Sequence, residues 1–376
     1  MTRTIVENAR IVTPTAVERG CLVVEGNDIA AISPDDPQVE ASKRVDAGGK
    51  YLLPGLVDLH GDDIERHVFP RSEARVPTSA ALETCDRANL AAGITTKFHA
   101  VAFEETPTEN RSLHLARELH QEIAAAESLL GRHHFHARCE VSDPDCVDAV
   151  TDAIADDGVS LVSLMNHVPG DGQFDDVDEF ERRYADGSGD WNVQSFADHR
   201  DCDESVLRER TGRLTKRAAD AGIPVASHDD DCPATVDRMS RHSVAISEFP
   251  VTMAAAERAT ELGLVTAMGA PNLVRGGSLW GNLDARAAAE NGVLDVLCSD
   301  YHPKSLLEAV FVDTGEPLPE RVSRATSAPA DAVGLNDRGR IVPGARADLL
   351  LVDTDPRPTV SHAFVDGQEV YRVGSS

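Results

Sequence analysis

Short apolar runs alternate with amphipathic stretches through the middle of the chain, between residues 53 and 338. Short apolar runs indicate buried strands, and apolar residues repeated three or four apart indicate helices. The predicted strands are Leu53–His60, Ile94–Ala100, Phe135–Val141, Ser160–His167, Pro224–His228, Ala245–Phe249, Val265–Met268 and Leu294–Asp300. The helix-like segments between them include Ala80–Ala92, Asn110–Leu130, Cys146–Asp156, Glu204–Ala221 and Thr252–Leu262.

This alternation predicts parallel β/α units, because parallel neighbours need a crossover connection that is usually a helix. Gly93, Gly222, Gly263 and Gly292 each stand between a predicted helix and the next strand, where helices commonly end. Eight such units predict an α/β fold, a (β/α)8 barrel of the TIM type. An open, doubly wound sheet is the alternative.

The two ends of the chain carry short β segments separated by turn residues instead. We expect residues 1–52 and 339–376 to form one small composite β-sandwich domain beside a barrel domain of residues 53–338. Residues 168–203 are the longest break in the pattern and are acidic. A long loop in a compact domain is usually functional or disordered, so a lid and a solvated acidic insertion are both consistent with this segment.

Acidic residues dominate the composition: 64 Asp and Glu stand against 36 Lys and Arg in 376 residues, a formal net charge of −28. Such a surface repels nucleic acids and anionic membranes, so neither is an expected partner. No stretch has the roughly 20 apolar residues that a membrane span needs. We favour a halophilic protein from a high-salt cytoplasm, where self-repulsion is screened, over an ordinary acidic cytoplasmic protein.

The cysteines also indicate a reducing cytoplasm. There are seven, scattered along the chain and without a C-x-x-C motif, which argues against a disulfide framework or a zinc ribbon. The N-terminal MTRTIVENARIV resembles a strand and has the features of neither a signal peptide nor a transit peptide. A small-molecule substrate is therefore the expected partner, and a homo-oligomer is left open.

Metal-capable side chains occur where the predicted strands end. His60 and Asp62 close the first strand, and residues two apart in a strand point to the same face. The other such residues are Glu140, His167, His228 and Asp300, at the ends of the third, fourth, fifth and eighth strands. One such residue alone is more often a capped turn, but barrel active sites lie at these strand ends. Three imidazoles and three carboxylates suit two divalent ions per chain.

Longer motifs give this pattern a family resemblance. PGLVDLHGD, GITT, the strand-end histidines, SD on the last strand and the closing G-x-I-x-x-G-x-x-A-D-L resemble the amidohydrolase superfamily. SEFPVTMAAAE, MGAPNLVRGGSLWGN, ASHDD and SDYHPKSLL are similar to its phosphonate-metabolism family, the α-D-ribose 1-methylphosphonate 5-triphosphate diphosphatases. The resemblance implies hydrolysis of that phosphorylated ribosyl phosphonate to the 5-phosphate and diphosphate. A metal-activated water would attack, with Asp300 as both metal ligand and general base.

Two departures from the wider superfamily affect the metal site. His60-x-Asp62 stands where most members carry H-x-H, and no strand-end lysine offers itself as the bridge between two metals. Lys97, which precedes His99 on the second predicted strand, is the nearest candidate lysine. We assign the bridge to Glu140 instead. A carboxylate in place of an imidazole favours manganese or iron but leaves zinc possible.

A triphosphate also needs cations and amide donors. The loop after the seventh strand offers Asn272, Arg275, Gly276, Gly277 and Ser278, and Arg71 and Lys304 are further candidates. On the third strand, Arg138 shares a face with Glu140 and is expected to point inward and pair with a carboxylate. Two rival functions remain: a cyclic-amide hydrolase of the dihydroorotase or hydantoinase type, and a non-catalytic barrel scaffold.

Overall fold

The computed structural model describes residues 2–35, 37, 39–71, 74–106, 110–167, 200 and 202–373. The segment predicted to be either a lid or an acidic insertion, 168–203, lies almost entirely outside these ranges.

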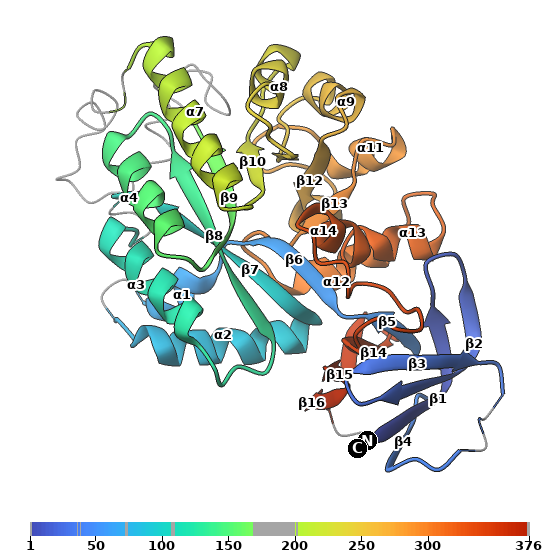
Figure 1. Cartoon of the computed structure of the whole chain (residues 1–376). Coiled ribbons are helices and arrows are strands. Elements are labelled where there is room, and N and C mark those ends of the chain that lie inside the picture. The colour runs from blue at the N-terminus through green and yellow to red at the C-terminus, as the bar shows by residue number, and fades with distance from the viewer. Residues whose placement is uncertain are drawn as a thin grey trace.

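Eight parallel strands form the central sheet, in the order of the sequence (Figure 1). They are β6 (Leu56–Gly61), β7 (Ile94–Phe103), β8 (Arg132–Glu140), β9 (Val159–Met165), β10 (Val225–His228), β11 (Ile246–Glu248), β12 (Val265–Gly269) and β13 (Val296–Cys298). A single bridge between Gly61 and Asp300 joins the last strand to the first. The Asp300 N–H donates to the His60 carbonyl at 2.8 Å, and the Asp62 N–H donates to the Asp300 carbonyl at 2.8 Å. These bonds nearly close the sheet, so the barrel prediction is confirmed and the open doubly wound sheet is wrong.

Helices pack around the barrel, and α14 (Ser327–Ala332) packs against the cluster of apolar residues inside it. They are α1 (Ile64–Val68), α2 (Thr78–Ala92), α3 (Leu113–Ala125), α4 (Pro144–Ala155), α7 (Glu204–Asp220), α8 (Pro233–Ser240), α9 (Met253–Glu261), α10 (Ala270–Arg275), α11 (Ala285–Glu290), α12 (Lys304–Val310), α13 (Leu318–Ser323) and α14. Local chemistry sets their ends. The Ser112 side chain accepts from the Leu115 N–H at 3.1 Å, so α3 begins after the predicted Asn110. Gly93 ends α2 in the left-handed region, with φ 91°. In the described ranges, no helix has both the length and the apolarity that crossing a bilayer requires.

The N- and C-terminal segments of the chain meet in a second sheet, at the lower right of Figure 1. Its eight strands are β1 (Arg3–Val12), β2 (Val17–Glu25), β3 (Asp28–Ser33), β4 (Lys43–Asp46), β5 (Tyr51–Pro54), β14 (Leu349–Asp353), β15 (Thr359–Val365) and β16 (Gln368–Arg372). Strand β5 pairs with β14, so the N- and C-terminal segments are hydrogen-bonded to each other. A two-domain division at the boundaries expected from the sequence stays a prediction.

One predicted strand, Leu53–His60, is two strands in the structure. Pro54 ends β5 in the terminal sheet, and Leu56 begins β6 in the barrel. The chain changes sheets at Gly55, where a Cβ atom would lie 2.1 Å from the Thr95 hydroxyl oxygen. Glycine lets the backbone pass this close to β7, which the apolar pattern alone did not reveal.

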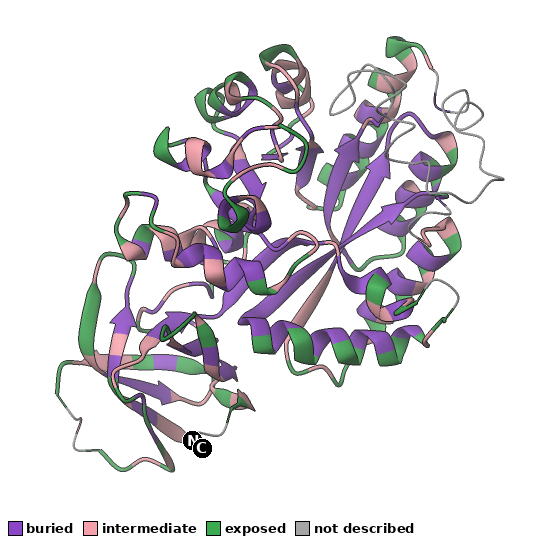
Figure 2. Ribbon diagram, turned by 180° about the vertical axis from the view of Figure 1, so that it is seen from behind, coloured by how far each residue is buried: buried purple, intermediate pink, exposed green. Residues whose placement is uncertain are grey.

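The barrel has two apolar layers, and its strands are almost uniformly buried in Figure 2. Inside, Val57, Phe98, Leu161 and Ile246 belong to one cluster. A second cluster fills the space between the strands and the outer helices. With both faces covered, the strands read as continuous apolar runs, which is why the sequence located them so well.

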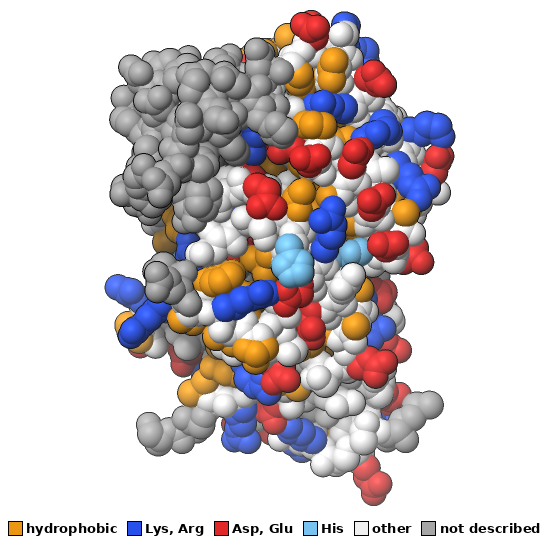
Figure 3. Space-filling model, turned by 90° about the vertical axis from the view of Figure 1, so that its left-hand side faces the viewer, with side chains coloured by type: hydrophobic (Ala, Val, Ile, Leu, Met, Phe, Trp, Pro, Cys, Tyr) orange, Lys and Arg blue, Asp and Glu red, His pale blue; other side chains and the backbone are white. Residues whose placement is uncertain are grey.

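Low salt should destabilise this fold. Acidic and basic side chains are interspersed on the face in Figure 3, yet the formal charge of the chain is −28. The Debye length grows from about 3 Å at 1 M salt to about 30 Å at 0.01 M, so repulsion is poorly screened at low salt. We expect the melting temperature to fall steadily between these conditions. An unchanged melting temperature would contradict the halophilic interpretation.

Candidate active site

The carboxyl ends of the barrel strands bring the predicted metal ligands to one end of the barrel. His60, Glu140 and His228 lie at the ends of β6, β8 and β10. His167 and Asp300 each follow their strand, β9 or β13, by two residues. Parallel strands all end on the same side, so the sequence could place these residues together without any knowledge of side-chain contacts.

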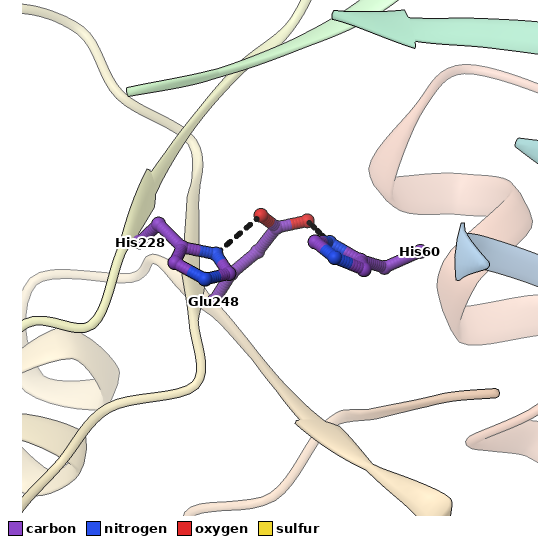
Figure 4. A group of neighbouring side chains, drawn as sticks. All are labelled: His60, His228 and Glu248. Carbon is purple, nitrogen blue, oxygen red and sulfur yellow. Dashed lines mark hydrogen bonds and ion pairs between the residues drawn. The ribbon is translucent and has the colours of Figure 1, made fainter. Parts of the chain in front are cut away.

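Glu248, at the end of β11, was missed in the sequence and lies between two of the predicted ligands (Figure 4). Its two carboxylate oxygens lie 3.3 Å from Nδ1 of His60 and 3.3 Å from Nδ1 of His228. Glu248 is opposite His228 in the β10–β11 register, and the Ser163 hydroxyl donates to it at 2.5 Å. Burial would raise the pKa of Glu248, but the neighbouring imidazoles of His60 and His136 outweigh it and hold the pKa well below its usual range.

His228 also belongs to a second group, with His167 and Asp229. Nε2 of His167 lies 3.3 Å from an Asp229 carboxylate oxygen, and Nε2 of His228 lies 3.6 Å from the same oxygen. Asp229 directly follows β10 and has φ 57°, an unusual backbone conformation for a residue other than glycine. Strained residues of this kind cluster at functional sites.

Both groups fit a divalent metal. In each, three ligand atoms lie within 4.8 Å of one another, and imidazole with carboxylate suits zinc, manganese or iron. His228 faces the first group with Nδ1 and the second with Nε2. A neutral imidazole has one lone pair, so His228 can ligate one ion at a time. If His228 held an ion through Nε2, Glu248 would accept from Nδ1 and orient the ring.

Asp62, another predicted ligand, pairs with arginines rather than with the histidines of the two ligand groups. The Asp62 carboxylate accepts from Arg111 at 3.1 Å and from Arg138 at 3.0 Å, and these guanidinium groups overcome burial to hold its pKa below the usual range. The inward, ion-paired Arg138 predicted from the sequence is therefore confirmed. Strand β6 ends at Gly61 and is irregular between Asp58 and Gly61, so simple alternation does not extend from His60 to Asp62.

Glu140, the predicted bridge, is enclosed by donors. It accepts from the Ser142 hydroxyl at 2.6 Å and from the His167 N–H at 3.0 Å, and an Arg200 nitrogen lies 3.4 Å away. Nδ1 of His167 is 3.2 Å from the same carboxylate. Burial acts to raise the pKa of Glu140, but the Arg200 charge and the His167 contacts outweigh burial and hold the pKa below its usual range.

Asp300 lies at the seam where the barrel closes. Its φ is 53°, and partial burial raises the pKa of its carboxyl to about 6. A Cβ atom on Gly269 would lie 3.2 Å from an Asp300 carboxylate oxygen. Gly269 thus leaves space for this carboxylate beside β12.

Lys97 takes no part in either ligand group. Its buried ammonium lies 3.0 Å from the Asp58 carboxylate and 2.9 Å from that of Asp63. These carboxylates outweigh burial and raise the pKa of Lys97. A carboxylated lysine needs an unprotonated amine, which this raised pKa disfavours, and the assignment of the bridge to Glu140 stays a prediction.

In the predicted phosphate loop, the guanidinium of Arg275 is exposed, whereas the backbone amides of Gly276 and Gly277 are already hydrogen-bonded. The Arg275 guanidinium donates to the Tyr301 hydroxyl at 3.1 Å and is exposed. The N–H groups of Gly276 and Gly277 instead donate to the Asn272 carbonyl, at 3.1 and 3.0 Å. The Asn272 side chain donates to the Leu283 carbonyl at 2.9 Å and accepts from the Ala285 N–H at 3.0 Å.

The remaining candidates for phosphate binding are less enclosed. The Ser278 hydroxyl accepts from the Trp280 N–H at 3.2 Å. Arg71 is exposed, and the Lys304 ammonium lies 3.5 Å from a Glu308 carboxylate oxygen in the next turn of α12. Arg66, which the sequence analysis missed, donates to the Tyr301 carbonyl at 3.1 Å. Arg66 and Arg275 thus flank the residue after Asp300.

Some of the missed residues had a sequence signal. Glu248 is the penultimate residue of the predicted sixth strand, as Glu140 is of the third, and Asp229 directly follows His228. Arg111 had no such signal, because it lies in the segment between β7 and α3 and meets Asp62 only through the tertiary fold.

Metal uptake by chelator-treated protein should strengthen as pH rises from about 7 to about 9. Burial lowers the pKa of His167, but its hydrogen bonds to Asp229 and Glu140 outweigh burial and raise the pKa to about 9. The pairing of protonated His167 with Asp229 and Glu140 therefore stabilises the fold at and below pH 6.5. This stabilisation is lost as pH rises through about 9. A metal must displace that proton, which costs about tenfold in affinity per pH unit below 9. Competition with a chelator at several pH values measures it; a flat profile would exclude His167 as a ligand.

Comparison with known proteins places the chain in a family. No protein-family model matches it. It is 33% identical over 387 residues to the α-D-ribose 1-methylphosphonate 5-triphosphate diphosphatase of Escherichia coli, covering 98% of this chain and 100% of that protein. It is 25% identical over 421 residues to a dihydroorotase of Anaplasma phagocytophilum, covering 95% of this chain and 87% of that protein.

Solved structures share the fold at low identity. A Xaa-Pro dipeptidase with bound methionine in the active site superposes with a TM-score of 0.69 at 16% identity, covering 99% of this chain and 100% of that chain. The chain belongs to the α-D-ribose 1-methylphosphonate 5-triphosphate diphosphatase family, within the amidohydrolase superfamily of barrel hydrolases.

Proposed function

We propose that this protein hydrolyses α-D-ribose 1-methylphosphonate 5-triphosphate to the 5-phosphate and diphosphate, with two divalent ions bound at the strand ends. The observation that carries the proposal is the pair of ligand groups around His228, in a chain 33% identical to a diphosphatase of that substrate over 98% of its length. The proposed ligands are His60, Asp62, Glu140, His167, His228, Asp229, Glu248 and Asp300. Such ions lower the pKa of a coordinated water toward 7 and polarise phosphoryl oxygens.

In this proposal Asp300 is the general base. A carboxyl with a pKa near 6 is ionised at neutral pH yet basic enough to accept a proton from the attacking water at its carboxylate oxygen. Backbone hydrogen bonds to His60 and from Asp62 fix the position of Asp300 at the closing seam. The base is thereby held beside the strand that carries His60.

Two arginines would handle the negative charge of the substrate. Arg138 lies between the ligand strands: it donates to Asp62 at 3.0 Å, and its guanidinium is 3.5 Å from Nε2 of His228. We assign Arg138 to a phosphoryl oxygen at the bond that breaks. Arg275, on the rim, would hold the leaving diphosphate and stabilise charge that develops there.

Phosphorus NMR of the purified protein with the ribosyl triphosphate tests the proposal. We expect diphosphate and ribosyl 5-phosphate as the products. In ¹⁸O-water the label should enter the ribosyl 5-phosphate, because attack at the α-phosphorus puts the water oxygen there. Label in diphosphate or orthophosphate would contradict attack at the α-phosphorus. Turnover of dihydroorotate or a hydantoin, with the triphosphate left intact, would favour the cyclic-amide alternative that the dihydroorotase relative keeps open.

Replacing Arg275 with alanine should lower kcat by about 100-fold or more, because an electrostatic contact to the leaving group is lost in the transition state. Lysine at this position should recover only part of the rate, since it lacks the bidentate fork of arginine. Arg286→Ala is the matched control: this arginine lies on neighbouring α11 and donates to the Asp313 carbonyl at 2.6 Å. Steady-state kinetics of the three variants decide. If Arg275→Ala and Arg286→Ala lowered kcat equally, this would contradict the role of Arg275 in stabilising the leaving diphosphate.

A further inference from the structure

A third group of metal-capable side chains lies just beyond the end of β6, between the barrel wall and two outer helices. Asp63 is the N-cap residue of α1, His67 lies four residues later on the same helix, and Cys85 lies in α2. Residues four apart on a helix share a face, so the side chains of Asp63 and His67 both lie on the side of α1 that faces Cys85 in α2. One ligand atom from each of the three residues lies within 4.8 Å of the other two.

The distances suit a single ion. One Asp63 carboxylate oxygen lies 3.8 Å from the Cys85 sulfur and 3.8 Å from Nε2 of His67. Around a tetrahedral zinc ion, with bonds of about 2.0–2.3 Å, neighbouring ligand atoms are about 3.3–3.8 Å apart. Binding would thus need only small side-chain shifts.

The surroundings leave these atoms available. The other Asp63 oxygen faces the Lys97 ammonium at 2.9 Å, so the carboxylate is divided between the lysine and the metal-facing side. Lys97 reaches this place across Gly61, where a Cβ atom would lie 1.9 Å from its Cε atom. The Asn89 amide donates to the Cys85 sulfur at 3.3 Å. Burial and the Asp63 carboxylate raise the pKa of the Cys85 thiol well above its usual range, so the thiolate would form only with a bound cation.

Charge also favours a cation here. Asp58 and Asp63 both contact the single ammonium of Lys97, and all three side chains are buried. One excess negative charge therefore remains in a region of low dielectric, which is costly. A divalent ion bound with Cys85 as a thiolate makes the group neutral. The His67 side chain is 25% exposed, which gives an ion a route in from solvent.

We propose that Asp63, His67 and Cys85 bind a divalent transition metal of the zinc class, separate from the ions at the strand ends. Binding releases the Cys85 proton to solvent, and a water fills the fourth coordination position. The ion joins α1 to α2 and braces the turn that follows His60 and Asp62. Its role is structural, and it is independent of the proposed function.

Cobalt substitution tests the site without an activity assay. A thiolate bound to Co²⁺ gives a near-ultraviolet charge-transfer band, whereas the proposed ligands at the strand ends include no cysteine. We expect this band when the full-length, metal-free protein is titrated with Co²⁺. Cys85→Ser should abolish it, and His67→Gln should weaken Co²⁺ binding at the same wavelength. Absence of the band in the wild-type protein would overturn the proposal.

Controls separate this site from other thiols and from the strand ends. Cys298→Ser and Cys232→Ser alter the cysteines nearest in sequence to Asp300 and His228, and both should keep the band. His228→Ala should also keep it. Loss of the band in Cys298→Ser or Cys232→Ser, with Cys85→Ser unaffected, would place the thiolate elsewhere. If Cys85→Ser does not fold, the partly exposed His67 provides the test, and unchanged Co²⁺ affinity in His67→Gln would overturn the site.

Discussion

Replacing His228 with alanine is expected to lower both turnover and tightly bound metal, turnover by about 100-fold or more. This imidazole is the one residue common to the two ligand groups, with Nδ1 toward Glu248 and Nε2 toward Asp229. Loss of an outer hydrogen-bond partner of a metal ligand typically costs about 10- to 100-fold, and loss of the ligand itself should cost at least as much. Metal analysis and steady-state kinetics of the same preparation measure both effects.

A variant of the neighbouring Glu248 tests whether this residue binds the metal directly or only orients His228. Glu248→Gln keeps the shape but removes the charge between His60 and His228. If Glu248 only orients His228, metal affinity should fall within the 10- to 100-fold range; a larger loss would indicate direct ligation. His114→Ala, at a side chain 84% exposed on α3, is the control and should change nothing. Full metal content in His228→Ala would contradict the proposed ligand set.

Asp300→Asn is expected to lower kcat by about 10²- to 10⁴-fold, the usual contribution of a general acid or base. Asparagine keeps the size of the side chain and the backbone bonds at the closing seam, but it cannot accept the proton. Because other residues supply most of the proposed ligands, we expect much of the metal to be retained.

The comparison that decides is the ratio of lost turnover to lost metal. Asp148→Asn is the control: its side chain is 69% exposed on α4, and it pairs with Arg213 at 2.6 Å. A wild-type rate in Asp300→Asn would exclude Asp300 as the base. An equal loss of metal and turnover would reduce its role to that of a ligand.

The barrel could be predicted because its strands are covered on both faces. Runs such as Val159–Met165 are mostly apolar, and the helices between them are amphipathic, so hydrophobicity marked most of the elements. The failure at Gly55 has an equally physical cause. Two apolar strands joined by one glycine look continuous in sequence, although they pair in different sheets.

The ligand positions could be predicted in part for a related reason. Parallel strands end on the same side, so His60, His167 and His228 had to approach one another. Their individual partners could not be deduced. Asp62 looked equivalent to His60, yet Arg111 and Arg138 hold it, because the segment before α3 and strand β8 bring those cations to the same place.

The sequence by itself thus determined the architecture, the acidic character and the end of the barrel where the chemistry lies, since periodicity and charge are local properties that a single chain records. The tertiary structure decided which side chains touch. Glu248 lies between two imidazoles, and Asp63, His67 and Cys85 converge behind the barrel wall, because segments distant in sequence pack at fixed separations. Contacts of that kind depend on distances of a few ångströms, which no spacing along the chain specifies.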